Sequence, residues 1–197
     1  MYVVALAGSP SPTSRSLKLA EQAKALLAEQ QIDTLLVSIY DFPAEDLLYA
    51  RFDSPAIKNL RSLVANAAGV VIATPIYKAA YSGALKALLD LLPEDALANK
   101  PTLPLASGGT PAHLLALDYA LKPVLTTLKA RDIQQGVFAI DKHIGSDDDG
   151  AIRLEPELDE RLRAAVSRFA ASLKALHPSR PLAHELRNRL VAGAISL

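Results

Sequence analysis

The sequence predicts an α/β domain in which a five-stranded parallel sheet lies between two layers of helices. Two observations lead to this prediction. Short apolar runs typical of buried strands alternate five times with longer segments whose apolar residues recur every three or four positions. Segments rich in serine, proline or glycine directly follow three of these runs, where doubly wound sheets carry their ligand loops.

Five segments have the composition of strands. Val70–Thr74 is apolar almost throughout, as expected for a strand that is covered on both faces. In chain order, the predicted strands are Tyr2–Ala7, Thr34–Ile39, Val70–Thr74, Thr102–Ala106 and Ile133–Ala139.

The segments between and after these strands have helical spacing. Pro93 ends the third predicted helix, Pro123 interrupts the fourth, and Pro156 suits the first turn of the last. The predicted helices are Ser16–Glu29, Pro55–Ala67, Ser82–Leu92, Pro111–Ala130 and Pro156–Leu176. We expect the stretch from Asp141 to Gly150, with three consecutive aspartates, to be a solvated loop.

The sequence of the loop after the first strand indicates which type of doubly wound fold the chain adopts. It contains neither G-x-G-x-x-G nor G-x-x-x-x-G-K-[ST], so the dinucleotide fingerprint and the P-loop are both absent. A serine- and threonine-rich loop here favours the strand order 2-1-3-4-5. That order binds flavin mononucleotide (FMN) at the switch point between the first and third strands.

Residues 8–16 of this loop suit a phosphate. They read Gly-Ser-Pro-Ser-Pro-Thr-Ser-Arg-Ser and open a helix, whose first turn has unpaired N–H donors and a partial positive charge. Arg15 adds a cation that forms strong hydrogen bonds to anions. The alternative is a serine-rich helix cap that binds no ligand.

The loops after the third and fourth strands should face the same crevice. Thr74, Pro75, Ile76 and Tyr77 follow one strand, and Tyr77 offers a flat face to an aromatic ring. Ser107–Thr110 follow the other, and two glycines allow a close backbone approach. The loop after the fourth strand could by itself be a plain turn, but three such loops at strand ends favour a ligand site.

Composition narrows the range of functions. The chain has 197 residues, no cysteine, 21 basic and 21 acidic residues, and a mean hydropathy of +0.18. This balance argues against nucleic-acid binding, and the four histidines (His113, His143, His177 and His184) lack the spacing of a metal site. The longest apolar run, from Ala67 to Ala73, is far shorter than the roughly 20 residues of a membrane span. Without a signal peptide, the expected compartment is the cytoplasm.

The high apolar content indicates either an unusually apolar core or apolar subunit interfaces, and it favours a homo-oligomer. We expect one domain over residues 1–177, followed by a tail over residues 178–197. That tail is either an amphipathic arm that docks on another subunit or a frayed terminus.

The motifs resemble those of the NAD(P)H-dependent FMN reductases of the flavodoxin-like superfamily. The likeness runs from residue 1 to about residue 140 and is strongest to the branch that supplies reduced flavin to alkanesulfonate monooxygenases. The matching segments are Leu6–Pro10, Ser14–Ser16, Glu45–Ala56, Ala73–Pro75 through Lys86, Pro104–Ala106 with Gly108–Thr110, and Ala112–Ala116 with Asp118–Val124.

The resemblance implies a role for each matched position. Ser9, Ser14, Arg15 and Ser16 would hold the FMN phosphate. The isoalloxazine would be bordered by Thr74, Pro75, Ile76 and Tyr77 and by Ser107, Gly108, Gly109 and Thr110. In this branch the helix that contains Tyr119 carries an extra residue, which makes a π-bulge at a tetramer interface. Tyr119 could otherwise be plain packing or a flavin contact.

The resemblance also implies the reaction. NADPH, or NADH, would transfer a hydride to N5 of FMN, and the reduced flavin would pass to a monooxygenase of sulfonate metabolism. We assign no catalytic acid or base, because hydride transfer between the two rings needs none. Members form dimers that pair into tetramers. We expect His113 to be a helix-start residue, although a flavin or interface contact is the alternative.

The chain departs from the family's motifs at two places, and two other functions are alternatives to FMN reduction. Many relatives have arginine where this chain has Ser11, which leaves the choice between NADPH and NADH open. Ile76 and Lys78 replace the glutamate and asparagine of wider relatives. The alternatives are a quinone or azo reductase with tightly bound FMN, and a flavodoxin-type electron carrier that is not an enzyme.

Overall fold

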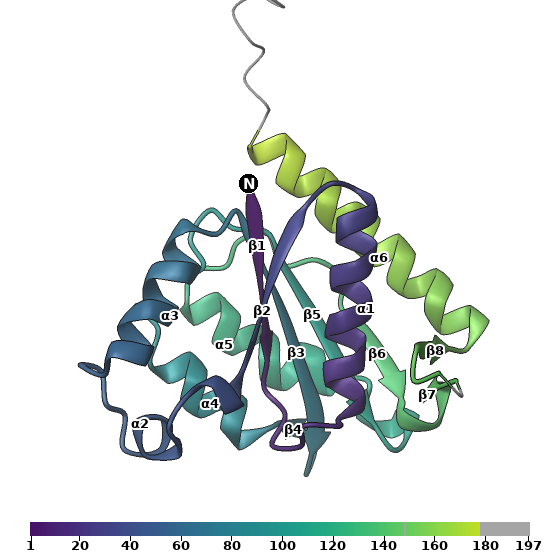
Figure 1. Cartoon of the computed structure of the whole chain (residues 1–197), viewed down its shortest axis with the longest axis horizontal. Coiled ribbons are helices and arrows are strands. Elements are labelled where there is room, and N and C mark those ends of the chain that lie inside the picture. The colour runs from purple at the N-terminus through teal and green to yellow at the C-terminus, as the bar shows by residue number, and fades with distance from the viewer. Residues whose placement is uncertain (148, 178–197) are drawn as a thin grey trace, which may run out of the picture.

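The sheet confirms the predicted fold class. A computed structural model describes residues 1–147 and 149–177, and Figure 1 shows a twisted sheet between two layers of helices. The parallel strands lie in the order β2-β1-β3-β5-β6, which is the predicted order 2-1-3-4-5, and β4 adds one short antiparallel strand to β3. Their bounds are β1 Tyr2–Ala7, β2 Asp33–Ser38, β3 Gly69–Tyr77, β4 Ala80–Tyr81, β5 Thr102–Gly108 and β6 Val137–Ile140.

Two separate cores result from the alternation of side chains along these strands. Val3, Ala5 and Val71 face one layer, formed by α1 and α6, whereas Val4 and Ile72 face the layer of α3, α4 and α5 (Figure 1). Because both faces are covered, the central strands are mostly apolar. The α-helices are α1 Arg15–Glu29, α2 Ala44–Leu48, α3 Pro55–Asn66, α4 Gly83–Asp90, α5 Lys122–Thr127 and α6 Pro156–Leu176.

The prediction of one helix over Pro111–Ala130 is wrong. This segment contains a 3-10 turn at Pro111–His113, a π-helix at Leu117–Leu121 and then α5. The π-helix confirms the helix irregularity that the family resemblance implied around Tyr119. It precedes Pro123, which occupies the first turn of α5 and has no N–H to donate to the turn before it.

The last strand begins later than predicted. Ile133 makes only an isolated bridge to Thr102, and β6 starts at Val137. The backbone at Gly136 approaches Pro104 so closely that a Cβ atom there would lie 2.8 Å from the Pro104 carbonyl oxygen. This close approach replaces regular pairing in the first half of the predicted strand.

Two elements were not predicted. A hairpin of β7 (Ile144–Ser146) and β8 (Ile152–Leu154) occupies much of the expected solvated loop, and Ile144 anchors it in the core. The other is α2, one turn and a half long, whose buried Asp46 accepts a hydrogen bond from Ser54 and pairs with Arg51. Both elements are too short for a hydrophobic period to reveal them.

The predicted tail from Pro178 to Leu197 lies outside the described residues. Within those residues, none of the helices has both the length and the apolar character that crossing a membrane requires.

Candidate active site

The three predicted ligand loops meet at one cavity. It measures about 180 Å³ and lies at the carboxyl ends of β1, β3 and β5, as expected for a doubly wound sheet. Its lining comprises Ser11, Thr13, Ser14, Arg15, Pro75, Ile76, Tyr77, Ser107, Gly108 and Asp141. Sequence reasoning brought most of these residues together, but it did not include Asp141.

The start of α1 forms the polar end of the cavity. The Ser14 hydroxyl caps the helix by accepting from the Leu17 N–H at 3.1 Å, and it lies 3.3 Å from the Ser16 hydroxyl. No acidic side chain stands in the first turn, so the positive end of the helix dipole is not compensated there. Within the described chain, the N–H groups of Arg15 and Ser16 meet no acceptor. This end of the cavity therefore suits an anion.

Arg15 spans the mouth of this anion site. Its Nε donates to the carbonyl oxygen of Asp141 at 3.2 Å, which ties α1 to the segment that follows β6. The side chain is exposed, and the terminal nitrogens of the guanidinium have donors left for a ligand.

Ser9 and Ser16 are held inside the loop instead of lining the cavity. Both are buried, and the Ser9 hydroxyl accepts from the Ser11 N–H at 3.1 Å. These two side chains shape the loop, so their predicted contact with the phosphate stays a prediction.

The opposite end of the cavity carries an aromatic ring on a strained hairpin. Tyr77 is 49% exposed at the end of β3. The following turn places Lys78 and Ala79 at φ values of 50° and 64° before the chain returns as β4. Such turns usually hold Asn-Gly, because residues with a Cβ are strained at positive φ. Strain of this kind concentrates at functional sites.

A network of buried hydrogen bonds beneath the cavity, the Thr74–Ser82 network, connects its loops. The fully buried Thr74 hydroxyl accepts from the Ser82 N–H at 3.0 Å and lies 3.0 Å from the Pro75 carbonyl. The Ser82 hydroxyl donates to the Gly8 carbonyl and accepts from the Leu85 N–H at 3.0 Å. Thr74 thus fixes the geometry of the site and does not line the cavity.

Gly8 belongs to the Thr74–Ser82 network through its carbonyl oxygen, and the close packing around it explains why a glycine stands there. A Cβ atom on Gly8 would lie 2.4 Å from the Cβ of Leu85, so any side chain there would push α4 away from β1. Sequence reasoning missed Ser82 as a site residue. The available signal was its position as the serine that caps the third predicted helix.

The loop after β5 borders the cavity only in part. Ser107 is buried and Gly108 lies against Phe138, whereas Gly109 and Thr110 are exposed beyond the cavity. The Thr110 hydroxyl accepts from the Ala112 N–H at 3.2 Å and caps the short 3-10 turn that ends at His113. No group of three or more metal-ligating side chains occurs among the described residues.

The comparison with known proteins decides the family. The family model that matches residues 1–145 is described as NADPH-dependent FMN reductase. The chain belongs to this family. It is therefore an oxidoreductase of the flavodoxin-like fold, and the matched residues include every loop that lines the cavity.

Close relatives extend the likeness over the whole chain. An FMN reductase (NADPH) of Pseudomonas putida KT2440 is 47% identical over 100% of both chains. An FMN reductase (NADPH) of Escherichia coli K12 is 52% identical over 88% of this chain and 90% of its own. The crystal structure of an NADH:FMN oxidoreductase in its apo form superposes with a TM-score of 0.79, at 39% identity and 92% coverage of both chains.

Proposed function

We propose that this protein reduces FMN with NADPH and releases the reduced flavin to a partner monooxygenase. The small, open cavity is the observation that carries this proposal. Cavities that enclose a whole organic ligand usually measure about 300–1,000 Å³, whereas this one measures about 180 Å³. It can surround one end of FMN and leaves the rest of the molecule accessible, which suits a flavin that is exchanged.

The residues of the cavity divide the work of binding. The N–H groups of Arg15 and Ser16, the Ser14 hydroxyl and the Arg15 guanidinium hold the phosphate. Tyr77 and Pro75 border the ring, and the backbone of Gly108 lies at the edge of the cavity where its polar edge would sit. When bound, FMN supplies N5 as the acceptor of the hydride that leaves C4 of the nicotinamide. The protein contributes by holding the two rings in contact.

The dependence of the reaction on added flavin tests this proposal. We expect a desalted sample to oxidise NADPH slowly alone and at least about tenfold faster with micromolar FMN, because a loosely held flavin is lost on desalting. NADPH absorbance and the reduction of a quinone are followed in parallel. Rapid turnover with the quinone in the absence of added FMN would contradict the proposal and favour a quinone reductase with tightly bound flavin.

The link to a monooxygenase needs its own experiment. The proposed partner is a reduced-flavin-dependent monooxygenase that acts on a sulfonate, a proposal supported by the segments Leu47–Pro55 and Tyr119–Pro123, which are characteristic of that branch. We expect this protein with FMN and NADPH to drive sulfite release by such an enzyme. Absence of sulfite, with normal FMN reduction, would remove the partner and leave the reductase.

We also propose a homotetramer. Two exposed apolar surfaces support it: a hollow of about 470 Å³ between residues 39–48 and α4, and a patch of Leu114, Leu115 and Tyr119 around the π-helix. Tyr119 is 78% exposed, which is unusual for an aromatic side chain in a monomer. One surface would form a dimer, and the π-helix would pair the dimers.

A further inference from the structure

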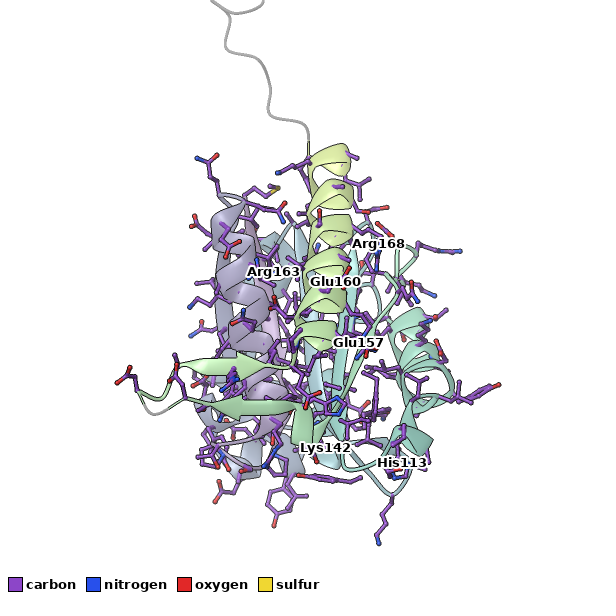
Figure 2. All side chains as sticks on the ribbon, turned by 90° about the vertical axis from the view of Figure 1, so that its right-hand side faces the viewer. His113, Lys142, Glu157, Glu160, Arg163 and Arg168 are labelled. Carbon is purple, nitrogen blue, oxygen red and sulfur yellow. The ribbon has the colours of Figure 1, made fainter. Side chains whose placement is uncertain are left out.

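A second cavity lies beside the first, between the β7–β8 hairpin and the start of α6. It measures about 270 Å³ and is lined by Lys142, His143, Gly145, Arg153, Leu154, Glu155 and Pro156. Asp141 lines the first cavity and directly precedes Lys142, so one short segment borders both. Figure 2 shows Lys142 at the same end of the molecule as His113, near the start of α6.

The charges of this second cavity favour an anion. Lys142 and Arg153 are exposed, and neither forms an ion pair within the described part of the chain. The only carboxylate in the lining belongs to Glu155, which lies 3.6 Å from Nε2 of His143. Among the described residues, Lys142 and Arg153 are thus two cations without an ion-pair partner, an arrangement that suits a phosphate dianion.

The wall of this cavity is held in place. Lys18 of α1 donates to the Ser146 hydroxyl at 2.6 Å, and the Glu155 N–H donates to the His143 carbonyl at 3.1 Å. Gly145 leaves room inside, because an added Cβ would meet no atom nearer than the Arg153 carbonyl at 3.9 Å. The acidic residues Asp147 and Asp149 belong to the turn at the far end of the hairpin. The end of the hairpin that carries Lys142 and Arg153 is therefore preorganised to bind a ligand.

We propose that Lys142 and Arg153 bind the 2′-phosphate of NADPH and so make the enzyme prefer NADPH to NADH. The inference rests on the proposed function, because it needs the nicotinamide ring to lie on a flavin bound in the first cavity. The two nucleotides differ only in this phosphate, and a nearby arginine is the usual means of recognising it. With its nicotinamide on the flavin, NADPH would extend past Asp141 and deliver its adenosine end to the hairpin. Arg153 lies beyond the residues that match the family model, so this subsite is not part of the shared motif.

The test compares nucleotides in a double variant. We expect Lys142→Ala with Arg153→Ala to lower the ratio of kcat/KM for NADPH to that for NADH by about tenfold or more, since two charge-assisted hydrogen bonds are lost. Inhibition by 2′,5′-ADP should weaken in parallel, whereas inhibition by 5′-AMP should not change. The matched control is Arg168→Ala, an exposed arginine that lies well along α6 from the cavity (Figure 2).

A second variant adds charge instead of removing side chains. Gly145→Glu places a carboxylate in the open part of the cavity, and it should lower the same ratio while circular dichroism and FMN affinity show an intact fold. An unchanged ratio in both variants overturns the inference, as does a parent enzyme that uses the two nucleotides equally well. It is also overturned if Lys78→Ala, on the ring side of the first cavity, removes the preference. Failure of the proposed function looks different, because FMN-dependent oxidation would then be absent with either nucleotide.

Discussion

Arg15 connects the start of α1 to the segment that follows β6, at the proposed flavin cavity. Its Nε donates to the Asp141 carbonyl oxygen, and both residues line the cavity. An exposed arginine contributes little to the folded state, so its place in the loop is explained better by a ligand than by packing.

Replacing this side chain should therefore affect binding and not folding. Arg15→Ala is expected to raise the Kd for FMN by about tenfold, because a charge-assisted contact to phosphate is lost, and to change the free energy of unfolding by less than about 0.5–1 kcal/mol. Quenching of flavin fluorescence measures the first quantity and urea denaturation the second. Lys24→Ala, exposed on the same helix, is the control. Equal FMN affinity in both variants would remove Arg15 from the phosphate site.

Tyr81, on the other side of the hairpin, is a residue whose titration reports on its burial. Desolvation raises its pKa above 10.0, opposed by the charge of Lys86 and reinforced by that of Asp90. Because the folded state holds this proton more tightly than the unfolded state, the associated stability is present below pH 10 and is lost as the pH rises through the raised pKa.

Ultraviolet titration can isolate this group. The difference between the parent protein and Tyr81→Phe, followed at the tyrosinate absorption band, should show one phenol that ionises above pH 10. A midpoint at or below that of free tyrosine would show that the ring is more exposed than the structure indicates.

At the scale of elements, the turn between β3 and β4 is held in place against its own preference. Lys78 and Ala79 both adopt positive φ, although neither is glycine or asparagine. The Thr74–Ser82 network fixes both ends of this hairpin, and β4 lies against the π-helix. The surrounding contacts thus impose the turn that presents Tyr77.

Relief of this strain should be measurable. Ala79→Gly is expected to raise the free energy of unfolding by about 0.5–1 kcal/mol, since the relief of about 1–2 kcal/mol at positive φ exceeds the entropy that glycine adds to the unfolded chain. The control Ala87→Gly, inside α4, should lower it by about 1 kcal/mol. Thermal and urea unfolding provide the measurement. A loss of stability in Ala79→Gly would show that the turn is not strained.

The same scale shows what the sequence could predict. α1, α3 and α6 begin and end within one residue of the predicted positions, because capping serines, first-turn prolines and regular apolar spacing mark them. The segment after Thr110 was predicted wrongly, because a π-helix has the same residue types as an α-helix and differs only in its hydrogen bonds.

The site was predictable to the extent that it consists of loops at strand ends. Arg15, Pro75, Tyr77 and Gly108 were found this way and line the cavity. Asp141 and Ser82 were not found, because one contributes its carbonyl and the other acts beneath the surface. The contacts of a backbone carbonyl and of a buried hydrogen-bond network cannot be recognised from amino-acid composition, since they depend on tertiary contacts between distant segments.

At the scale of the whole molecule, apolar side chains gather on two separate surfaces. Leu48, the last residue of α2, is exposed and lines one hollow, and the exposed Tyr119 belongs to the π-helix. Asp118 and Lys122, next to Tyr119, pair with each other at the surface. An exposed aromatic residue beside a charged pair suits a small interface with a polar rim.

The proposed tetramer makes Tyr119 the residue to replace. Tyr119→Ala should convert four-copy particles into two-copy particles in light scattering after size-exclusion chromatography, because a central aromatic anchor is lost. Leu176→Ala, which removes an exposed apolar side chain at the end of α6, should leave the mass unchanged. A parent protein that elutes as a monomer would refute the tetramer.

The small volume of the proposed flavin cavity has a consequence for how the enzyme behaves in air. A site that closes over its ligand protects reactive species from side reactions, but a hollow of about 180 Å³ cannot cover FMN. Its product should therefore be open to dissolved oxygen as soon as it forms. When no partner enzyme takes up the reduced flavin, the electrons of NADPH should reduce oxygen to hydrogen peroxide. The rate of transfer to the partner would therefore set the fraction of NADPH that is oxidised unproductively.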